Sequence, residues 1–260
     1  MVATARLQKA QSKASEARPY ADEMIAVMRQ LGAACAEINH PLLEAREVQN
    51  TGILVVTSDR GMAGSYNTNV NRKVLEITRS LDKQKVKLIT VGKKGKAFFA
   101  TRGYNIAAEF TMPSSEVTFA DARLVSRTVM GMFESGEIDV VHIIYTRFIS
   151  AMRQMVTEMQ LLPAVPPSGE QCGVNEDYMF EPKPSALLGD LLPRYVDTQV
   201  YRAMLESLAS EHGARMTAMT SATDSAGEMI DRLTLDYNRA RQSAITTELT
   251  EIVGGAEVLR

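Results

Sequence analysis

Two long stretches, one at each end of the chain, place apolar or small residues at alternating spacings of three and four. In the first forty residues the stripe consists of Leu7, Ala10, Ala14, Ala17, Ala21, Met24, Met28, Leu31, Cys35 and Ile38. In the last third it consists of Met216, Met219, Thr223, Ala226, Ile230, Leu233, Tyr237, Ala240 and Ala244. This alternation is the seam of a supercoiled helix. Because two seams must face each other or a partner, we predict a long antiparallel coiled coil with a domain inserted between its helices.

The alternative interpretation is a pair of ordinary amphipathic helices packed on a core, but strict alternation over nine or ten positions favours the coiled coil. Leu205, Leu208 and His212 extend the second seam upstream, with a stutter just after His212 that should unwind the supercoil. Pro19 predicts a kink or break near Arg18. Much of the second seam is Ala and Thr, which bury little apolar area, so we expect partners to supply part of the stability.

The middle of the chain alternates between β-branched runs and helical spacing. Continuous apolar runs bounded by Gly, Asp or Asn are typical of buried parallel strands. The predicted strands are 52–58, 86–91, 105–110 and 139–146, with an edge strand within 152–162, and the predicted helices are 70–81, 94–101 and 119–134. This alternation predicts an α/β fold with a mostly parallel sheet.

The last third begins with a loop and continues as one long helix. Five prolines between Pro163 and Pro184 indicate the loop. The helix is predicted from about Ser185 to Val253, where Gly254 and Gly255 should end it, and it would span on the order of 100 Å at 1.5 Å per residue. The predicted parts are therefore residues 1–47 (first coiled-coil helix), 48–165 (α/β domain), 166–184 (loop) and 185–260 (second coiled-coil helix).

Composition narrows the partner classes. Twenty-nine basic against thirty-one acidic residues give a net charge of −2, so neither nucleic acid nor an anionic membrane is the expected partner. No apolar run reaches transmembrane length and no leader peptide is visible, so we expect a cytoplasmic chain without direct membrane insertion. Cys35 and Cys172 are expected to be separate thiols.

Candidate catalytic chemistry is sparse. The loop 58–67 follows the first strand at the edge where α/β sheets bind ligands, but its Gly-x-x-Gly spacing matches no nucleotide-binding motif and favours a tight turn. The lysines within 92–96 are typical of a solvated helix start. His40, His142 and His212 lie on different elements, so no metal site, triad or cofactor is predicted. An α/β enzyme acting on a phosphorylated small molecule is the weakest of the alternative functions.

Short motifs in a fixed order run along nearly the whole chain. They are MVA at 1–3, RPY at 18–20, HP at 40–41, SDRGMAG at 58–64, LLP at 161–163, SEHGARM at 210–216, ATD at 222–224 and YNRARQSAITTELTEIVGG at 237–255. By these motifs the sequence resembles the gamma subunit of the F-type ATP synthase, the rotating central stalk. The resemblance also implies a further helical segment of roughly two turns ahead of this N-terminus.

The resemblance implies a coiled coil seated in a hexamer of alternating alpha and beta subunits, with the α/β domain against an epsilon-type subunit and the membrane c-ring. No bond is made or broken on such a chain, which would be peripheral at the cytoplasmic face of the cell membrane. The implied hexamer contacts are Arg241, Gln242, Thr246 and Glu248. Tyr178 and Glu181 match the foot at the c-ring, with an ordinary loop anchor as the alternative. A coiled-coil scaffold that buries its seams in a self-dimer is the other alternative function.

Overall fold

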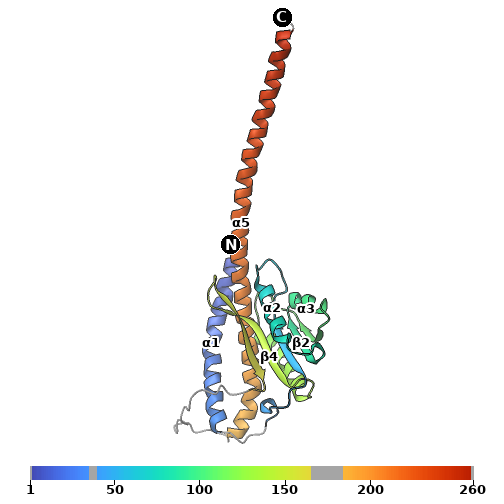
Figure 1. The fold of residues 1–260 in the computed structure, drawn as a ribbon. Coiled ribbons are helices and arrows are strands. Elements are labelled where there is room, and N and C mark those ends of the chain that lie inside the picture. The colour runs from blue at the N-terminus through green and yellow to red at the C-terminus, as the bar shows by residue number, and fades with distance from the viewer. Residues whose placement is uncertain (1, 35–39, 165–183, 259–260) are drawn as a thin grey trace. The chain divides into compact units, whose positions relative to one another are not determined.

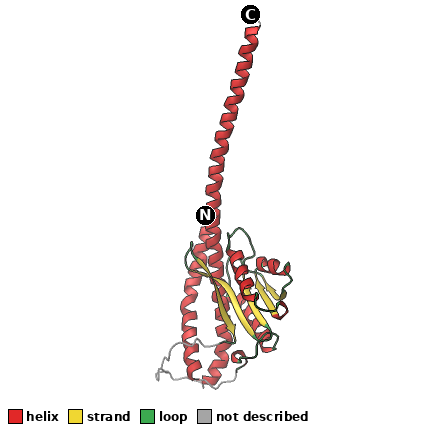
Figure 2. Ribbon diagram, viewed as in Figure 1, coloured by secondary structure: helices red, strands yellow, loops and turns green. Residues whose placement is uncertain are grey.

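The computed structural model describes residues 2–34, 40–164 and 184–258. The chain divides into two compact units, Met1–Thr217 and Ala218–Arg260, and the last helix is continuous through both (Figures 1 and 2). The elements in chain order are α1 (Val2–Ala34), η1 (Pro41–Leu43), β1 (Thr51–Val56), α2 (Tyr66–Thr78), η2 (Lys83–Lys85), β2 (Val86–Val91), α3 (Lys93–Ala100), β3 (Asn105–Phe110), α4 (Phe119–Glu134), β4 (Val140–Phe148), β5 (Gln154–Leu162) and α5 (Pro184–Val258).

The first unit contains a five-stranded sheet in the order β3-β2-β1-β4-β5. Strands β3, β2, β1 and β4 are parallel, and β5 joins β4 as an antiparallel edge strand. Every residue of β1 is buried, which explains its continuous apolar sequence. The predicted α/β fold with a mostly parallel sheet is confirmed, and the predicted bounds of β2, β3 and α4 match the structure.

Helices cover both faces of the sheet and create two hydrophobic cores. On one face, Leu54 of β1 and Ile143 of β4 pack in a core that also contains residues of α1, α4 and α5. On the other face, Ile53 and Val55 of β1 pack in a smaller core with α2 and α3. Alternate residues of one strand therefore serve different layers, as the pleat of a strand requires.

Helix α1 lies beside the first part of α5, and the two run in opposite directions (Figure 1). Asp22 of α1 forms an ion pair with Arg202 at 3.1 Å, and Arg18, earlier in α1, lies 4.0 Å from Glu206, later in α5. Contacts that move backward along one helix and forward along the other define an antiparallel pair. The first predicted stripe faces this contact, since its members Leu7, Ala10, Ala14, Ala21, Met24 and Met28 are buried.

The stripe of α1 packs against the upstream extension of the second seam, since Leu205 and Leu208 lie in the same core and Met216 packs against it. This core also includes Leu188, Leu192, Val196 and Val200 of α5, which the predicted seam did not contain. These residues recur every four positions and are larger than the Ala and Thr of the downstream seam, so they bury more apolar area. In the second unit the seam residues are exposed, for example Leu233 at 60%. That seam is therefore left for a partner.

Pro19 lies inside α1, so the helix is not broken near Arg18, and α5 likewise contains Pro193. The predicted end of the last helix at Gly254 and Gly255 is wrong. Helix α5 continues through Gly254 and Gly255 and ends at Val258. A glycine weakens a helix by roughly 0.5–1 kcal/mol relative to alanine, which a helix of 75 residues can absorb without ending there.

Candidate partner-binding surface

The four residues predicted to contact a hexamer lie in the second unit, on the exposed part of α5. Arg241, Gln242, Thr246 and Glu248 are all exposed. At 100° per residue, Arg241 and Glu248 lie on one side of the helix, and Gln242 and Thr246 lie on another side about 130° away. Within the described part of the chain, no hydrogen bond or ion pair of the chain itself engages these four side chains. Two charges, an amide and a hydroxyl are thus presented from two separate sides of the helix.

Several threonine hydroxyls on this part of α5 are turned onto their own helix. Thr234 donates to the carbonyl oxygen of Ile230 at 2.8 Å, Thr247 to that of Ser243 at 2.9 Å and Thr250 to that of Thr246 at 2.7 Å. This bond satisfies a hydroxyl internally and slightly weakens the helix. These hydroxyls are therefore already engaged within the helix, so the surface offers fewer free donors than its sequence indicates.

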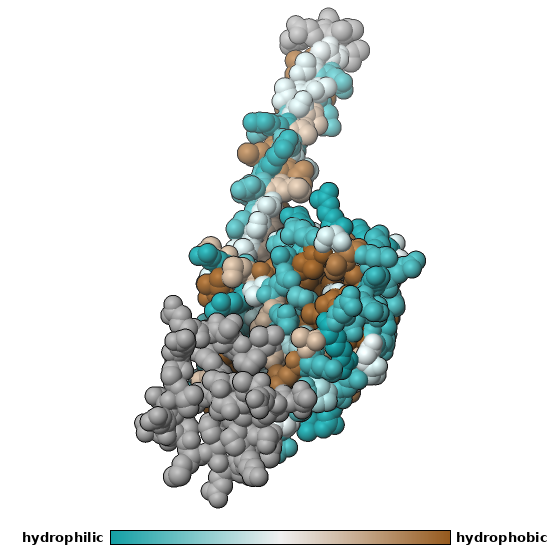
Figure 3. All heavy atoms as spheres, turned by 60° about the horizontal axis from the view of Figure 1, so that its bottom comes forward, coloured by the Kyte–Doolittle hydropathy of each residue, from teal (hydrophilic) through white to brown (hydrophobic). Residues whose placement is uncertain are grey.

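Large apolar side chains share this surface with the polar ones. Exposed members include Met229, Ile230, Leu233, Leu235, Tyr237, Ile245, Leu249, Ile252 and Val253. Brown and teal residues accordingly alternate along the helix in Figure 3. Clustered exposed apolar side chains mark an interaction site. Ile245, Leu249 and Ile252 form a tip stripe that sequence reading missed, although their spacing of four and three signals it.

The predicted foot residues Tyr178 and Glu181 lie outside the described residues, as do Cys35 and Cys172. Of the predicted contact residues, the structure thus describes the four on α5 and not the two of the foot. Among the described residues, no cluster of His, Cys, Asp and Glu could hold a metal ion, and no described helix is long and apolar enough to cross a bilayer.

The edge of the sheet where a phosphorylated ligand would bind is already occupied by the chain itself. The first three backbone N–H groups of α3, at 93–95, donate to Asp59 Oδ1, the Ser58 carbonyl oxygen and Thr57 Oγ1 at 3.0, 3.1 and 3.0 Å. A phosphate at a helix N-terminus needs these same donors. An open hollow of about 330 Å³ beside them is lined by Lys96 and Glu109, which pair with each other. This arrangement disfavours a phosphate-binding enzyme.

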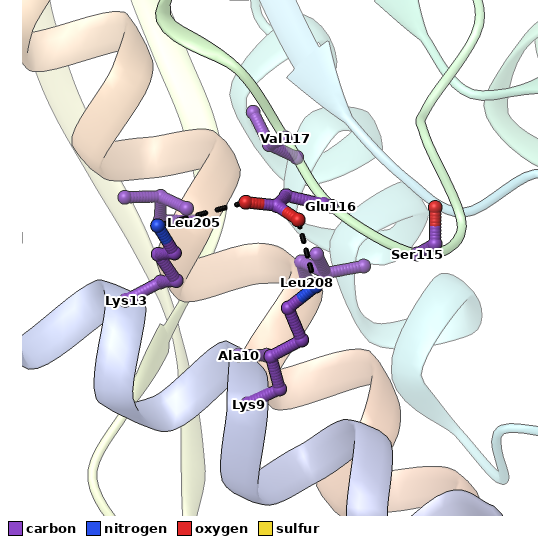
Figure 4. Close-up of a pocket in the computed structure, with 8 residues that line it drawn as sticks. All are labelled: Lys9, Ala10, Lys13, Ser115, Glu116, Val117, Leu205 and Leu208. Atoms are coloured by element: carbon purple, nitrogen blue, oxygen red, sulfur yellow. Dashed lines mark hydrogen bonds and ion pairs between the residues drawn. The ribbon is translucent and has the colours of Figure 1, made fainter.

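The loop between β3 and α4 is fastened to α1 by an ionic cluster (Figure 4). Glu116 lies 2.7 Å from Lys9 and 3.6 Å from Lys13. The hydrogen bond from Lys9 and the positive charges of both lysines lower the pKa of Glu116. The enclosed space here is only about 10 Å³, which is no larger than one water. This cluster is a structural tie, and it is too small to bind a ligand.

A second polar cluster is buried where α5 crosses the sheet. Burial raises the pKa of Glu211 despite its hydrogen bond from Arg215. Burial, assisted by the charge of Arg215, lowers the pKa of the neighbouring His212 to about 4. The phenol of Tyr66 is also buried there, which raises its pKa. Such shifts often mark active sites, but here the groups face a packed helix–sheet contact.

The chain was compared with known proteins. A family model described as ATP synthase matches residues 1–259. The ATP synthase gamma chain of Heliobacterium modesticaldum is 47% identical over 266 residues, covering 100% of this chain and 91% of the relative. That of Symbiobacterium thermophilum is 46% identical over 262 residues, with the same coverage.

Among solved structures, a chain from the cryo-EM structure of the Euglena gracilis mitochondrial ATP synthase (OSCP/F1/c-ring) aligns with a TM-score of 0.65 and 20% identity. The alignment covers 99% of this chain and 93% of that one. A chain from the central stalk and c-ring structure of the Tetrahymena thermophila enzyme gives a TM-score of 0.62 at 21% identity, with coverage of 86% and 100%. At these identities the likeness shows the fold alone.

The fold and the exposed helix surface define a stalk-like protein. Its α/β domain is joined to a long helix that offers a surface for binding a partner. The full-length sequence matches make the assignment specific: the chain belongs to the ATP synthase gamma chain family, the central stalk of the F-type ATP synthase.

Proposed function

We propose that this chain is the non-catalytic rotor that couples rotation of a membrane c-ring to conformational change in a catalytic head of alpha and beta subunits. The observation that carries the proposal is the exposed surface of α5 beyond residue 217, where apolar and polar side chains alternate on one continuous helix. Arg241, Gln242, Thr246 and Glu248 are the proposed contacts with the head. Their mixed chemistry suits contacts that must break and re-form as successive subunits pass.

The remaining partners are carried over from related enzymes. The solved relatives are described as central stalk, c-ring, F1 and OSCP assemblies, and here we assign the c-ring and an epsilon-type subunit to the α/β end, with Tyr178 and Glu181 as proposed foot contacts. We propose the same domain bounds as above: residues 1–47 for the first coiled-coil helix, 48–165 for the α/β domain, 166–184 for the loop and 185–260 for the second coiled-coil helix. Bound to these partners, the subunit sits peripherally at the cytoplasmic face of the membrane.

The test is to mix the chain with alpha and beta subunits, separate the mixture by gel filtration and assay ATP hydrolysis across the eluate. One copy per hexamer with stimulated hydrolysis is expected.

The double variant Arg241→Ala with Gln242→Ala should lower coupled ATP turnover of the assembled enzyme while the chain stays folded, because both side chains are exposed. The matched control is Arg79→Ala with Gln84→Ala, an exposed Arg and Gln on the α/β domain, which should change nothing. Equal turnover in the two double variants rejects the assigned contacts.

The same gel-filtration experiment also distinguishes the alternative functions. A self-dimeric scaffold elutes as a dimer without alpha or beta subunits and leaves their hydrolysis unchanged. An α/β enzyme would turn over a phosphorylated substrate as an isolated chain, which the occupied N-terminus of α3 argues against.

A further inference from the structure

Helix α5 presents an unusually polar face to the sheet. Its buried polar contacts involve Asp197, Ser207, Ser210, Glu211 and Arg215, a set that we call the docking face. Asp197 to Arg215 is 18 positions, or about 27 Å of helix at 1.5 Å per residue. A core contact of this length is normally apolar, because each buried polar group must find a partner or lose stability.

The central contact joins α5 directly to the backbone of a strand. The parallel ladder between β1 and β4 ends at the pair Val55–Ile144. Two residues further along β4, the N–H of Thr146 donates to Ser207 Oγ at 3.3 Å, and its carbonyl oxygen accepts from Ser210 Oγ at 3.1 Å. Beyond the end of β1, the helix thus takes up the hydrogen-bonding groups of β4. Both serines are fully buried, so these bonds are shielded from water.

Two further ties lie on either side of this contact. Toward the start of α5, Asp197 accepts a hydrogen bond from Ser126 of α4. Toward its far end, Arg215 donates to the carbonyl oxygen of Gly61 at 3.3 Å and to the buried carboxylate of Glu211. The docking face therefore engages a helix, a strand and a loop of the α/β domain at successive levels.

Directional bonds of this kind resist a motion that apolar packing permits. Ridges of side chains can move by one turn into the next grooves, and packed helices in other proteins do shift in this way. A hydroxyl bonded to a strand amide resists such a shift, because the shift breaks the bond. On its other edge, β4 continues to pair with β5 through Thr146 as far as Phe148, so the strand that the serines bind is part of the sheet.

We propose that Ser207 and Ser210 are positioning residues that lock α5 in one axial and rotational setting on the sheet while the subunit transmits torque, an inference that rests on the proposed coupling function. Torque that enters through the α/β domain reaches α5 through its apolar core contact and through the docking face, and only the docking face supplies directional bonds between α5 and a strand. Loss of one hydrogen bond of about 1 kcal/mol raises the population of a slipped setting about five-fold.

The test uses the complete ATP synthase in proteoliposomes, with Ser207→Ala and Ser210→Ala introduced singly and together. Two quantities are measured: ATP hydrolysis with the proton gradient collapsed, and the largest gradient that ATP hydrolysis can sustain. A third measurement is the angular fluctuation of a bead fixed to the α/β domain while the enzyme is paused. We expect unchanged hydrolysis without load, a smaller maximal gradient and a broader fluctuation, each greatest in the double variant.

The matched control is Val129→Ala in α4, which removes fully buried side-chain atoms without touching the docking face. If the serines only stabilise the fold, this control will reproduce their effects at an equal loss of melting temperature, and the lock is rejected. An unchanged gradient and fluctuation in the double variant also rejects it. If the double variant does not assemble, the single variants decide by the same criteria. Failure of the proposed function itself is distinct, since the unaltered chain would then sustain no gradient.

Discussion

Replacing Arg215 by methionine isolates the ionic part of the docking face. The Arg215 side chain is 17% exposed, and its Glu211 partner is 4% exposed. Methionine keeps most of the aliphatic stem but removes the charge and the donors. The buried carboxylate of Glu211 is then left facing Asp59 and Arg60, the other charges that influence its pKa.

Breaking a buried ion pair by removing one partner costs about 3–5 kcal/mol. Because Arg215 is partly exposed and Glu211 can take up a proton, we expect about 3 kcal/mol at pH 8, the lower end of that range. For a folded unit of this size, a melting temperature falls by about 2–4 °C per kcal/mol. The expected decrease is therefore about 6–12 °C.

The deficit should depend on pH in a defined direction. Burial already raises the pKa of Glu211, and Arg215 opposes that rise, so the variant raises the pKa further. When the pKa of a carboxyl is higher in the folded state than in the unfolded state, the protein loses stability as the pH rises through the folded-state pKa. Arg215 also lowers the pKa of His212, so its removal reduces the cost of charging that imidazole. Both effects make the deficit smaller at pH 5.5 than at pH 8.

Thermal unfolding of the full chain, followed by near-UV circular dichroism at pH 5.5, 7 and 8, measures these differences. The companion variant Arg215→Met with Glu211→Gln should regain most of the lost stability at pH 8, since no buried charge remains. A deficit of equal size at all three pH values, or a double variant less stable than the single one, would falsify the reasoning.

Three further outcomes are expected. Gly92→Ala should cost about 3 kcal/mol or more, because Gly92 has a φ of +100° and a Cβ would lie 2.4 Å from the Thr57 carbonyl oxygen; Gly103→Ala, with a φ of +71° and open space around it, should show a much smaller decrease in melting temperature. The pKa of His212 is lowered to about 4 in the folded state, so the protein loses stability between pH 6.5 and 4 as the unfolded state takes up the proton. In His212→Gln the free energy of unfolding should therefore fall less over this pH range. An equal fall in both proteins contradicts this. Ile230→Ala with Leu233→Ala should leave the melting temperature of the chain nearly unchanged but weaken its binding to alpha and beta subunits roughly ten-fold; the exposed Leu124→Ala on α4 is the control for binding, and equal affinity in all three chains refutes a contact at this seam.

Local pattern was sufficient for much of the fold. The apolar runs of β1, β2 and β4 predict buried strands, because a parallel strand that is covered on both faces is apolar at nearly every position. The stripe from Leu7 to Met28 predicts the buried face of α1 because every third or fourth residue of a helix shares one side. The candidate contacts on α5 came from the family resemblance, and the structure adds that their side chains are exposed on one helix.

What the sequence could not determine was which surfaces meet. The predicted seam did not include Leu188 to Val200, which the structure adds to the core shared by α1 and α5. No local pattern marks Ser207, Ser210 and Glu211 as buried, because polar side chains are usually exposed. The burial of the two serines depends on Thr146, more than sixty positions away, whose backbone N–H and carbonyl oxygen lie beyond the end of the β1–β4 ladder and bond to them. The sequence by itself determined most of the elements, the antiparallel helix pair and the family; the tertiary structure decided which residues of α5 meet α1 and which form the docking face, because these contacts join residues that no local pattern connects.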